Sequence, residues 1–311
     1  MTAPPVFASV EGYVSRIGDA GFWAPVAAEV LERHALAGAR AEPAAGFNAT
    51  YPTFVYGEVV VKLFGFVPSW REAHAAELAA HDVLATDPEI RAPSLLAAGR
   101  LYDDEDAAWP YLITTRMPGV ASWRAGLSTA DRRSLAAELG RQVRRVHGLR
   151  PAGAATEKDW PAANVSAAAA RSSLPPHLVA QIDSYLAKLR PFDRVVVHGD
   201  LVANHAFVEN GRLTGIIDWG DAMVTDRHYE LIQIHRDTFE CDRALLRVFL
   251  DACNWPAAAD FPRQALGHAL RRQAVGLLQH HTIDVFEPIA ALFPLGDIAT
   301  LDDLATVLFD V

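Results

Sequence analysis

The sequence contains little cysteine, and this scarcity argues against a cysteine-based metal site. Only two cysteines occur among the 311 residues, Cys241 and Cys253. Their spacing is not that of a zinc site. We therefore expect two buried thiols in a reducing, cytoplasmic environment.

Long apolar runs and an excess of basic residues are also missing. No apolar run approaches the ~18 residues of a membrane span, and the N-terminal MTAPPVFASVEGY lacks the basic start and apolar core of a signal peptide. Against 38 acidic residues stand 28 lysines and arginines, a net charge of −10, whereas nucleic-acid binding needs basic patches. The sequence thus predicts neither a membrane nor a nucleic-acid partner. The net negative charge is compatible with a cationic small molecule as ligand. The sequence is compatible with a monomer or a homodimer.

Strand patterns occur early in the chain and helix patterns dominate later, which predicts an α+β protein. The early part alternates short apolar runs with turns. Its expected elements are helices over 22–36 and 69–85 and strands over 53–56, 59–64 and 110–115. With 311 residues the chain is long enough for two lobes. We expect a small α+β lobe over residues 1–117 and a larger, mainly helical lobe over 118–311.

The later part begins with a clear helix signal. Ser128 followed by Asp131 predicts a capped N-terminus. One apolar stripe follows at Leu135, Leu139, Val143 and Val146. A second helix is expected near Pro175-Pro176, and the stretches 151–156 and 162–171 are expected to be surface loops.

The most informative stretch is VVVHGDLVANHAFVENGRLTGIIDWGDA, residues 195–222. It places two carboxylates, Asp200 and Asp218, at the ends of apolar strand-like runs. The Asn210-Gly211 pair between them predicts a two-residue hairpin turn, which folds the second carboxylate back toward the first. A magnesium–nucleotide site needs one carboxylate to accept a proton and another to hold metal.

HGDLVANH followed by IIDWGDA resembles the catalytic and metal-binding segments of the aminoglycoside phosphotransferase family. The C-terminal part, RHYELIQIHRDTFECDRALLRVFLDACNW and then HHTIDVFE, is most similar to hygromycin B phosphotransferases. The resemblance implies a bilobal, protein-kinase-like fold. It also implies a nucleotide-binding N-lobe and a C-lobe that carries catalysis and acceptor binding.

The resemblance assigns Asp200 as catalytic base and Asp218 as the main Mg²⁺ ligand. His205 departs from the family pattern, which usually has asparagine there, but macrolide phosphotransferases resemble this chain in having histidine. His205 is thus a candidate metal ligand. Alternatively Asn204 supplies the oxygen, the second metal is weakly held, or the site is inactive. His198 is expected to be structural.

In the first lobe, Lys62 ends a run of three valines and resembles the kinase lysine that grips the phosphates of ATP or GTP. Its expected partner is Glu77, with Glu72 as the fallback. The resemblance also places nucleotide-binding positions at a hinge and at a phosphate-covering loop, namely Thr115, Met117, Asn48 and Thr50.

The C-terminal helices are expected to form the acceptor side. The candidates for substrate binding are Asp221, Glu230, His235, Glu240 and Asp284. Further polar residues of this region are Asp237, His280, His281 and Glu287. Asp226 is expected to brace the catalytic loop.

The sequence therefore predicts an antibiotic O-phosphotransferase with a hygromycin-type aminoglycoside as the first choice of acceptor. A macrolide, a nucleoside antibiotic or a metabolite such as a sugar or choline are alternatives within the same chemistry. A non-catalytic, nucleotide-binding pseudokinase is the alternative of another class.

Overall fold

The computed structural model describes residues 3–36, 42–46, 50–103, 108–150, 164–191, 193–256, 258–278 and 284–311. The chain forms two compact units, one of residues 1–85 and 92–117 and one of residues 86–91 and 118–311. The sequence-based division put all of 1–117 into one lobe. In the structure the segment 86–91 packs with the second unit, where the Arg91 amide donates to Gln142 Oε1 at 2.7 Å and Arg145 pairs with Asp87 at 3.0 Å.

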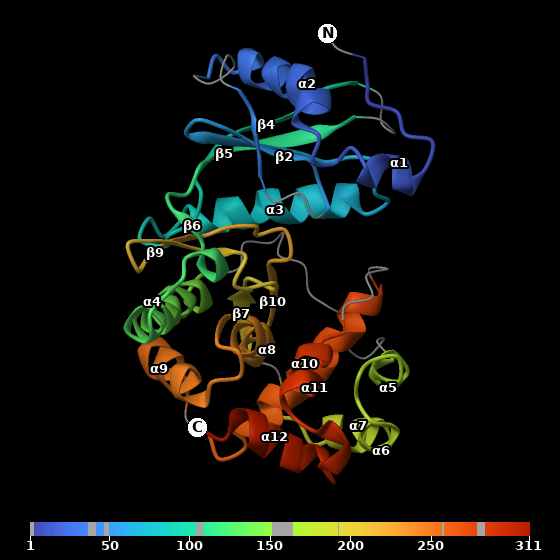
Figure 1. Ribbon diagram of the computed structural model, residues 1–311, viewed down its shortest axis with the longest axis vertical. Coiled ribbons are helices and arrows are strands. Elements are labelled where there is room, and N and C mark those ends of the chain that lie inside the picture. The colour runs from blue at the N-terminus through green and yellow to red at the C-terminus, as the bar shows by residue number, and fades with distance from the viewer. Residues whose placement is uncertain are drawn as a thin grey trace. The chain divides into compact units, whose positions relative to one another are not determined.

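The described residues of the first unit form a sheet and three helices (Figure 1). Its elements are α1 (Val10–Val14), α2 (Ala20–Arg33), β1 (Ala44–Ala45), β2 (Thr53–Tyr56), β3 (Val59–Leu63), α3 (Trp70–Leu84), β4 (Leu95–Arg100) and β5 (Pro110–Thr115). The antiparallel sheet has the order β1-β2-β3-β5-β4.

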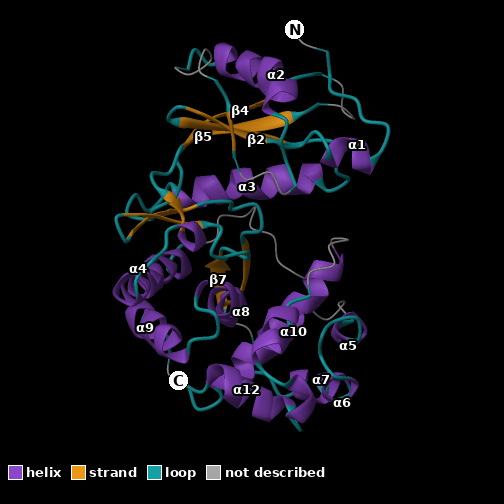
Figure 2. Ribbon diagram, in the orientation of Figure 1, coloured by secondary structure: helices purple, strands orange, loops and turns teal. Residues whose placement is uncertain are grey.

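Helices cover both faces of this sheet, α2 on one and α3 on the other (Figure 2). Because strand side chains alternate between faces, β3 serves both layers. Val61 and Leu63 pack in the cluster that contains Trp23 of α2. Lys62 points to the opposite face, toward Glu77 of α3. The strand register therefore directs the one lysine of this run to the α3 side.

The second unit is mainly helical. Its strands are β6 (Val120–Ala121), β7 (Arg194–Val197), β8 (Ala206–Glu209), β9 (Arg212–Ile216) and β10 (Met223–Asp226). Its α-helices are α4 (Thr129–His147), α5 (Val165–Ala169), α6 (Pro176–Val179), α7 (Ile182–Leu186), α8 (Leu231–Gln233), α9 (Arg243–Cys253), α10 (Phe261–Leu278), α11 (Glu287–Leu292) and α12 (Leu301–Phe309). Short turns of other helix types are η1 (Ser122–Arg124), η2 (Arg227–Glu230), η3 (Ile234–Thr238) and η4 (Leu295–Asp297).

The predicted hairpin is confirmed. Strands β8 and β9 pair antiparallel on either side of Asn210 and Gly211, whose φ values of 49° and 72° are those of a type I′ turn. Strand β6 pairs with β8 and completes a three-stranded sheet. Strand β7 does not join this sheet. It pairs with β10, which the sequence analysis did not anticipate.

The helix signals over 128–146 are also confirmed. Ser128 and Asp131 form a reciprocal capping box at the start of α4, and the predicted apolar stripe is buried. The expectation of loops over 162–171 was wrong in part, because α5 forms there and buries Ala168 and Ala169. The single helix expected near residue 175 is two short helices, α6 and α7.

Both cysteines are free and buried, as expected. Burial raises the pKa of Cys241 to about 11 and that of Cys253 to about 12, so both remain thiols at neutral pH.

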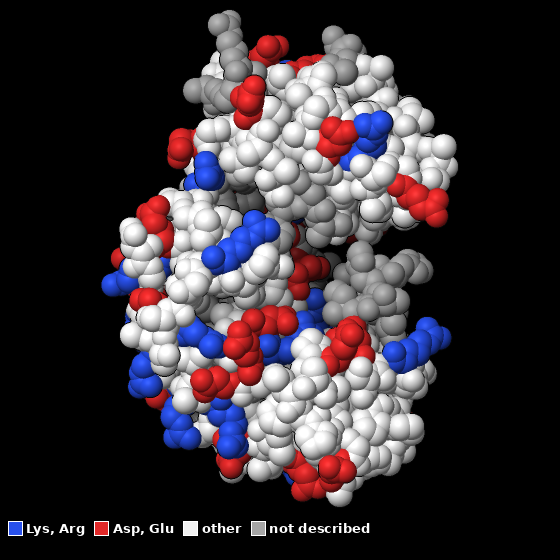
Figure 3. Space-filling model, in the orientation of Figure 1, with Lys and Arg blue, Asp and Glu red and all other residues white. Residues whose placement is uncertain are grey.

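The described surface carries charges of both signs. Acidic and basic side chains are interspersed over the helical unit on the face that Figure 3 shows. Among the described residues, no helix combines the length and the apolar character needed to cross a membrane.

The closest approach of α4 to α9 depends on Gly140. A methyl group at this position would overlap the carbonyl oxygen of Phe249 and lie 3.0 Å from the Ala252 side chain. We expect Gly140→Ala to lower the free energy of unfolding of the second unit by about 1–3 kcal/mol, since the two helices must separate. Chemical denaturation followed by circular dichroism measures this change. The matched control is Gly296→Ala, where the added methyl meets no atom within 4 Å. Equal effects of the two substitutions would contradict the packing argument.

Candidate active site

Two loops of the second unit meet at the candidate site. One follows β7 and contains Asp200; the other follows β9 and contains Asp218. Gly199 lies where they touch: its φ is 82°, and a side chain on it would overlap the carbonyl oxygen of Asp221. Glycine is therefore required by the backbone conformation and by the close approach. Asp218 also has a positive φ, 63°, a conformation that is uncommon outside glycine and clusters at functional sites.

His198 forms hydrogen bonds to both loops. Its Nε2 donates to the carbonyl oxygen of Ile217 at 2.9 Å, and its Nδ1 accepts the Asp200 amide at 3.2 Å. The ring is 1% exposed and lies 4.5 Å from the Trp219 ring, centroid to centroid. Burial lowers the pKa of His198, and the neighbouring His205 lowers it further. The geometry is that of a neutral, structural histidine.

The Asp200 carboxylate is oriented by two partners from elsewhere in the unit. Arg272 of α10 contacts its Oδ1 through Nη2 at 3.0 Å, and Gln233 of α8 donates to the same oxygen. The side chain of Arg272 is 5% exposed and that of Asp200 is 27% exposed. A buried guanidinium needs anionic partners, and Asp200 supplies one. One oxygen of Asp200 is thereby held, and the carboxylate is still accessible.

His205 lies between the two carboxylates. Its Nδ1 is 2.7 Å from the Asp200 carbonyl oxygen and 3.7 Å from Asp200 Oδ2, while Nε2 is 3.5 Å from Asp218 Oδ2. If Nδ1 carries the proton that the carbonyl accepts, Nε2 presents its lone pair on the side of Asp218. The structure thus brings together the three residues that the sequence analysis singled out.

This donor set fits a divalent cation. An imidazole nitrogen whose other nitrogen is bonded to a carbonyl is the usual form of a histidine ligand, and a carboxylate oxygen faces it. No cluster of three or more His, Cys, Asp or Glu ligands occurs in the described part of the chain. Magnesium needs no such cluster, because it is commonly held by one or two carboxylates together with substrate phosphates.

Asp221 lies beside this constellation. Burial raises its pKa, the carboxylates of Asp200 and Asp218 raise it further, and Arg272 opposes the shift. Asp221 therefore shares the electrostatic environment of the site, and its backbone contacts Gly199.

Glu230 braces the loop that contains Asp200, which corrects two assignments. Glu230 Oε1 accepts the His198 amide at 2.7 Å, and the residue is 0% exposed. It therefore supports the loop from inside and offers no surface to an acceptor. Asp226 is also structural, but its oxygens accept the amides of Asp193 and His228 instead of the catalytic loop.

The other candidates for acceptor binding differ in burial. His235 is 0% exposed beside the Phe309 ring, so its assignment to substrate binding is corrected to a core position. Glu240 is exposed and pairs with Arg132 at 3.1 Å. Asp284 accepts the amide of Ser173 at 2.6 Å and that of Phe286 at 2.9 Å. His280 and His281 lie outside the described residues.

In the first unit, Lys62 is paired with Glu77. The Nζ–Oε2 distance is 2.6 Å, and the side chains are 16% and 8% exposed. The ammonium group also lies over the rings of Phe64 and Tyr51, at 5.4 Å and 5.9 Å from the centroids. Glu72, the fallback, is exposed at the start of α3. The pair fixes the direction of the lysine side chain.

The remaining nucleotide candidates are positioned by main-chain contacts. Thr115 ends β5, where its amide donates to the Ser94 carbonyl at 2.9 Å, and Met117 is the last residue of the first unit. The carbonyl oxygen of Thr50 accepts the Tyr13 hydroxyl at 2.7 Å. Asn48 lies outside the described residues.

The sequence analysis missed Arg272 and Gln233. A signal for Arg272 exists in α10, where Gln264, His268 and Arg272 recur every four residues and are all buried. Polar residues spaced by four lie on one face of a helix, and buried polar groups need partners inside the fold. Gln233 has no comparable signal.

Comparison with known proteins agrees with this geometry. Residues 49–263 match the model of the phosphotransferase enzyme family that includes the aminoglycoside phosphotransferases. The chain belongs to this family. Its members are enzymes that transfer phosphate, and the bilobal α+β fold is the one expected.

The solved relatives share the fold at low identity. The GDP complex of wild-type aminoglycoside 2'-phosphotransferase-IIIa has a TM-score of 0.61 and 18% identity, covering 79% of this chain and 89% of that one. Macrolide 2'-phosphotransferase from Brachybacterium faecium has a TM-score of 0.62 and 18% identity, covering 88% and 98%. A Streptomyces rimosus aminoglycoside phosphotransferase in complex with ADP and streptomycin has a TM-score of 0.53 and 20% identity, covering 80% and 98%.

A hygromycin kinase gives a short sequence match. Hygromycin-B 4-O-kinase from Escherichia coli is 43% identical over 44 residues, which are 14% of this chain and 13% of that protein. The chain thus matches about an eighth of the length of this relative.

The buried position of His235 predicts a pH effect on stability. Burial lowers its pKa from 6.5 to about 4. Between these values the unfolded chain binds the proton and the folded one does not, so the free energy of unfolding falls as the pH falls from 6.5 toward 4, by up to about 1.4 kcal/mol per pH unit. We expect His235→Leu to remove this part of the slope in urea titrations at several pH values. Phe309→Leu, which changes the packing partner but no titratable group, keeps the slope. A wild-type slope in His235→Leu would contradict a neutral buried histidine.

Proposed function

We propose that this protein is an antibiotic O-phosphotransferase that moves the γ-phosphate of ATP or GTP to a hydroxyl of a small molecule and so confers resistance. The observation that carries the proposal is the constellation of Asp200, His205 and Asp218, with one imidazole within 4 Å of both carboxylates. The Lys62–Glu77 pair of the first unit adds the phosphate-gripping group that such a reaction needs.

In this proposal Asp200 aligns the attacking hydroxyl and accepts its proton. Phosphoryl transfer has a loose transition state, in which the proton leaves late, so orientation matters more than base strength. The contacts of Arg272 and Gln233 with Oδ1 fit this demand, because they fix the carboxylate while its charge stays partly balanced. Lys62 binds the α- and β-phosphates, and backbone groups of Thr115 and Met117 bind the base edge.

Asp218 and His205 would hold magnesium together with phosphate oxygens. The ion, when bound, neutralises charge that develops on the transferred phosphoryl group. Because imidazole is a borderline ligand that magnesium does not favour, Asp218 is the stronger of the two ligands in this proposal. Asn204 is the alternative oxygen donor.

A hygromycin-type aminoglycoside is the first acceptor to test. The short match to the hygromycin kinase supports it, and the net charge of −10 is complementary to an amine-bearing antibiotic. Asp221, Glu240 and Asp284 are the carboxylates proposed to contact the acceptor. A macrolide is the next candidate, because the Brachybacterium faecium relative acts on macrolides and resembles this chain over most of its length. A nucleoside antibiotic or a metabolite would use the same chemistry.

The donor is either ATP or GTP. The neighbours crystallised with GDP and with ADP support both choices. The reaction needs a nucleoside triphosphate, so we expect the protein to work in the cytoplasm, as a monomer or a homodimer.

A coupled assay of nucleoside diphosphate release tests the proposal. The protein is incubated with magnesium and either ATP or GTP against aminoglycosides, macrolides and nucleoside antibiotics, and products are analysed by mass spectrometry. We expect one phosphorylated product in the aminoglycoside series, with hygromycin B first. Tight nucleotide binding without turnover of any acceptor would instead favour the pseudokinase.

Removing the proposed base tests its role directly. We expect Asp200→Asn to lower kcat by about 10²–10⁴-fold, since the hydroxyl is no longer deprotonated or aligned. The KM for nucleotide stays near the wild-type value. Asp251→Asn, an exposed carboxylate of α9, is the matched control and keeps full activity. Full turnover in Asp200→Asn would refute the proposed mechanism.

The pair in the first unit is tested by two substitutions on one helix. Glu77→Gln leaves Lys62 without its carboxylate, so we expect the KM for nucleotide to rise about tenfold, equivalent to about 1.4 kcal/mol of binding free energy. The KM for the acceptor is unchanged. Glu72→Gln removes an exposed acid from the same helix and has no such effect. Steady-state kinetics with either substrate varied distinguish the two, and equal nucleotide KM values in both variants would exclude the pair from nucleotide binding.

A further inference from the structure

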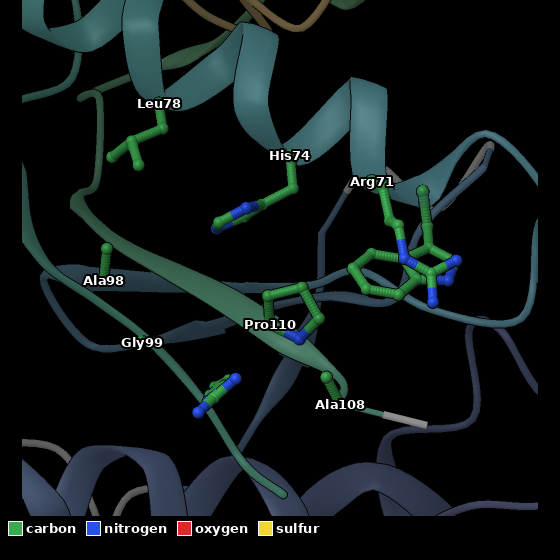
Figure 4. Close-up of a pocket in the computed structure, with 9 residues that line it drawn as sticks. Arg71, His74, Leu78, Ala98, Gly99, Ala108 and Pro110 are labelled. Atoms are coloured by element: carbon green, nitrogen blue, oxygen red, sulfur yellow. The ribbon is translucent and has the colours of Figure 1, made fainter. Parts of the chain in front are cut away.

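The first unit contains a pocket that the proposed reaction does not use. It has a volume of about 560 Å³ and lies between α3 and the edge of the sheet formed by β4 and β5 (Figure 4). Its walls include Arg71, His74 and Leu78 of α3, Ala98 and Arg100 of β4, and Pro110 of β5. We call it the α3–β4 pocket. A volume in this range is typical of sites for small molecules.

The pocket exists because the edge strand carries small residues. Ala98 pairs with Leu112 across the strands β4 and β5, and Leu112 packs on the α3 side of the sheet. Because the side chain of Ala98 is only a methyl group, it leaves a space under α3 that a longer side chain would fill. Gly99, the next residue, faces the other side of the sheet, where a methyl group would approach the Tyr111 hydroxyl to 2.5 Å. The floor under α3 is therefore apolar and left open by Ala98.

The described lining of the pocket carries positive charge. Its described lining contains two arginines and no carboxylate, in a protein of net charge −10. Arg71 lies over the Trp70 ring at 4.4 Å from the centroid. Arg100 has an exposed side chain and pairs with the fully exposed Asp103 at 3.7 Å, a contact of little energetic value.

An imidazole ring forms part of the pocket wall. His74 extends from α3 into the hollow (Figure 4). Its Nε2 is enclosed by the protein, so a ligand meets the ring of His74 and not this nitrogen.

We propose that the α3–β4 pocket binds a small organic anion with a flat apolar body, such as an aryl carboxylate. The apolar body lies on Leu78, Ala98 and Pro110 and against the His74 ring, and an arginine of the rim pairs with the carboxylate.

Occupancy of this pocket affects the helix that holds Lys62 in place. His74 and Glu77 are separated by three positions on α3, so they lie one turn apart on neighbouring faces. A ligand that joins α3 to β4 restricts the helix in the position where Glu77 reaches Lys62. This consequence rests on the proposed role of Lys62 in nucleotide binding. It predicts that the anion and the nucleotide strengthen each other's binding, because such coupling is reciprocal.

Direct binding tests the pocket without reference to activity. The probe is 2-naphthoate, and its uncharged control is 2-naphthamide, both titrated calorimetrically into the full-length protein. We expect naphthoate to bind at least about tenfold more tightly than the amide, and Arg71→Gln or Arg100→Gln to weaken its binding by about tenfold. Ala98→Phe, which fills the floor, abolishes binding. Equal affinity for the two probes, or wild-type affinity in Ala98→Phe and in both arginine variants, would overturn the assignment.

Nucleotide affinity tests the coupling separately. We expect saturating naphthoate to lower the Kd for nucleotide severalfold in the wild-type protein and in Glu72→Gln, but not in Glu77→Gln, which still binds naphthoate. If nucleotide fails to bind at all, the proposed function fails while the naphthoate titration still decides the pocket. Naphthoate binding with an unchanged nucleotide Kd would exclude the coupling.

Discussion

The site of the helical unit depends on the close approach of two loops at Gly199. No other residue fits there, because the backbone has a positive φ and the carbonyl of Asp221 occupies the space of a side chain. The contact is stabilised by His198, which bonds to Ile217 on one side and to the Asp200 amide on the other. Glu230 then holds the His198 amide from the interior. Backbone geometry thus positions the two acids before any ligand binds, which is the preorganisation that electrostatic catalysis requires.

The polar groups around Asp200 differ in how deeply they are buried. Arg272 and Gln233 contact one carboxylate oxygen from the buried side, and His205 lies near the other. Farther inside, Glu230 and His235 are enclosed and support structure. Burial therefore separates the polar residues of the C-terminal region into those that are accessible and those that are enclosed and support the fold, and residue type alone does not make this distinction.

In the first unit, a single strand contributes side chains to both layers. The alternation of β3 sends Val61 and Leu63 into the α2 layer and Lys62 into the α3 layer. Helix α3 contributes Glu77 to the ion pair with Lys62 and His74 to the lining of the α3–β4 pocket. One helix thereby contributes both to an ion pair and to a pocket whose described lining holds two arginines.

Local patterns in the sequence were sufficient for the capping box of α4, the Asn210-Gly211 hairpin, the α+β class and the approach of Asp200, His205 and Asp218 to one another. These features depend on neighbours along the chain, where turn preferences and periodicity act directly. Strand β10, the short helix α5, the loop brace Glu230 and the contacts of Arg272 and Gln233 with Asp200 were decided only by the tertiary structure. The strand pairing and the side-chain contacts join residues that are far apart in the sequence, and α5 is too short to be stable without the packing of Ala168 and Ala169. The burial and hydrogen bonding that define these features exist only once the chain has folded.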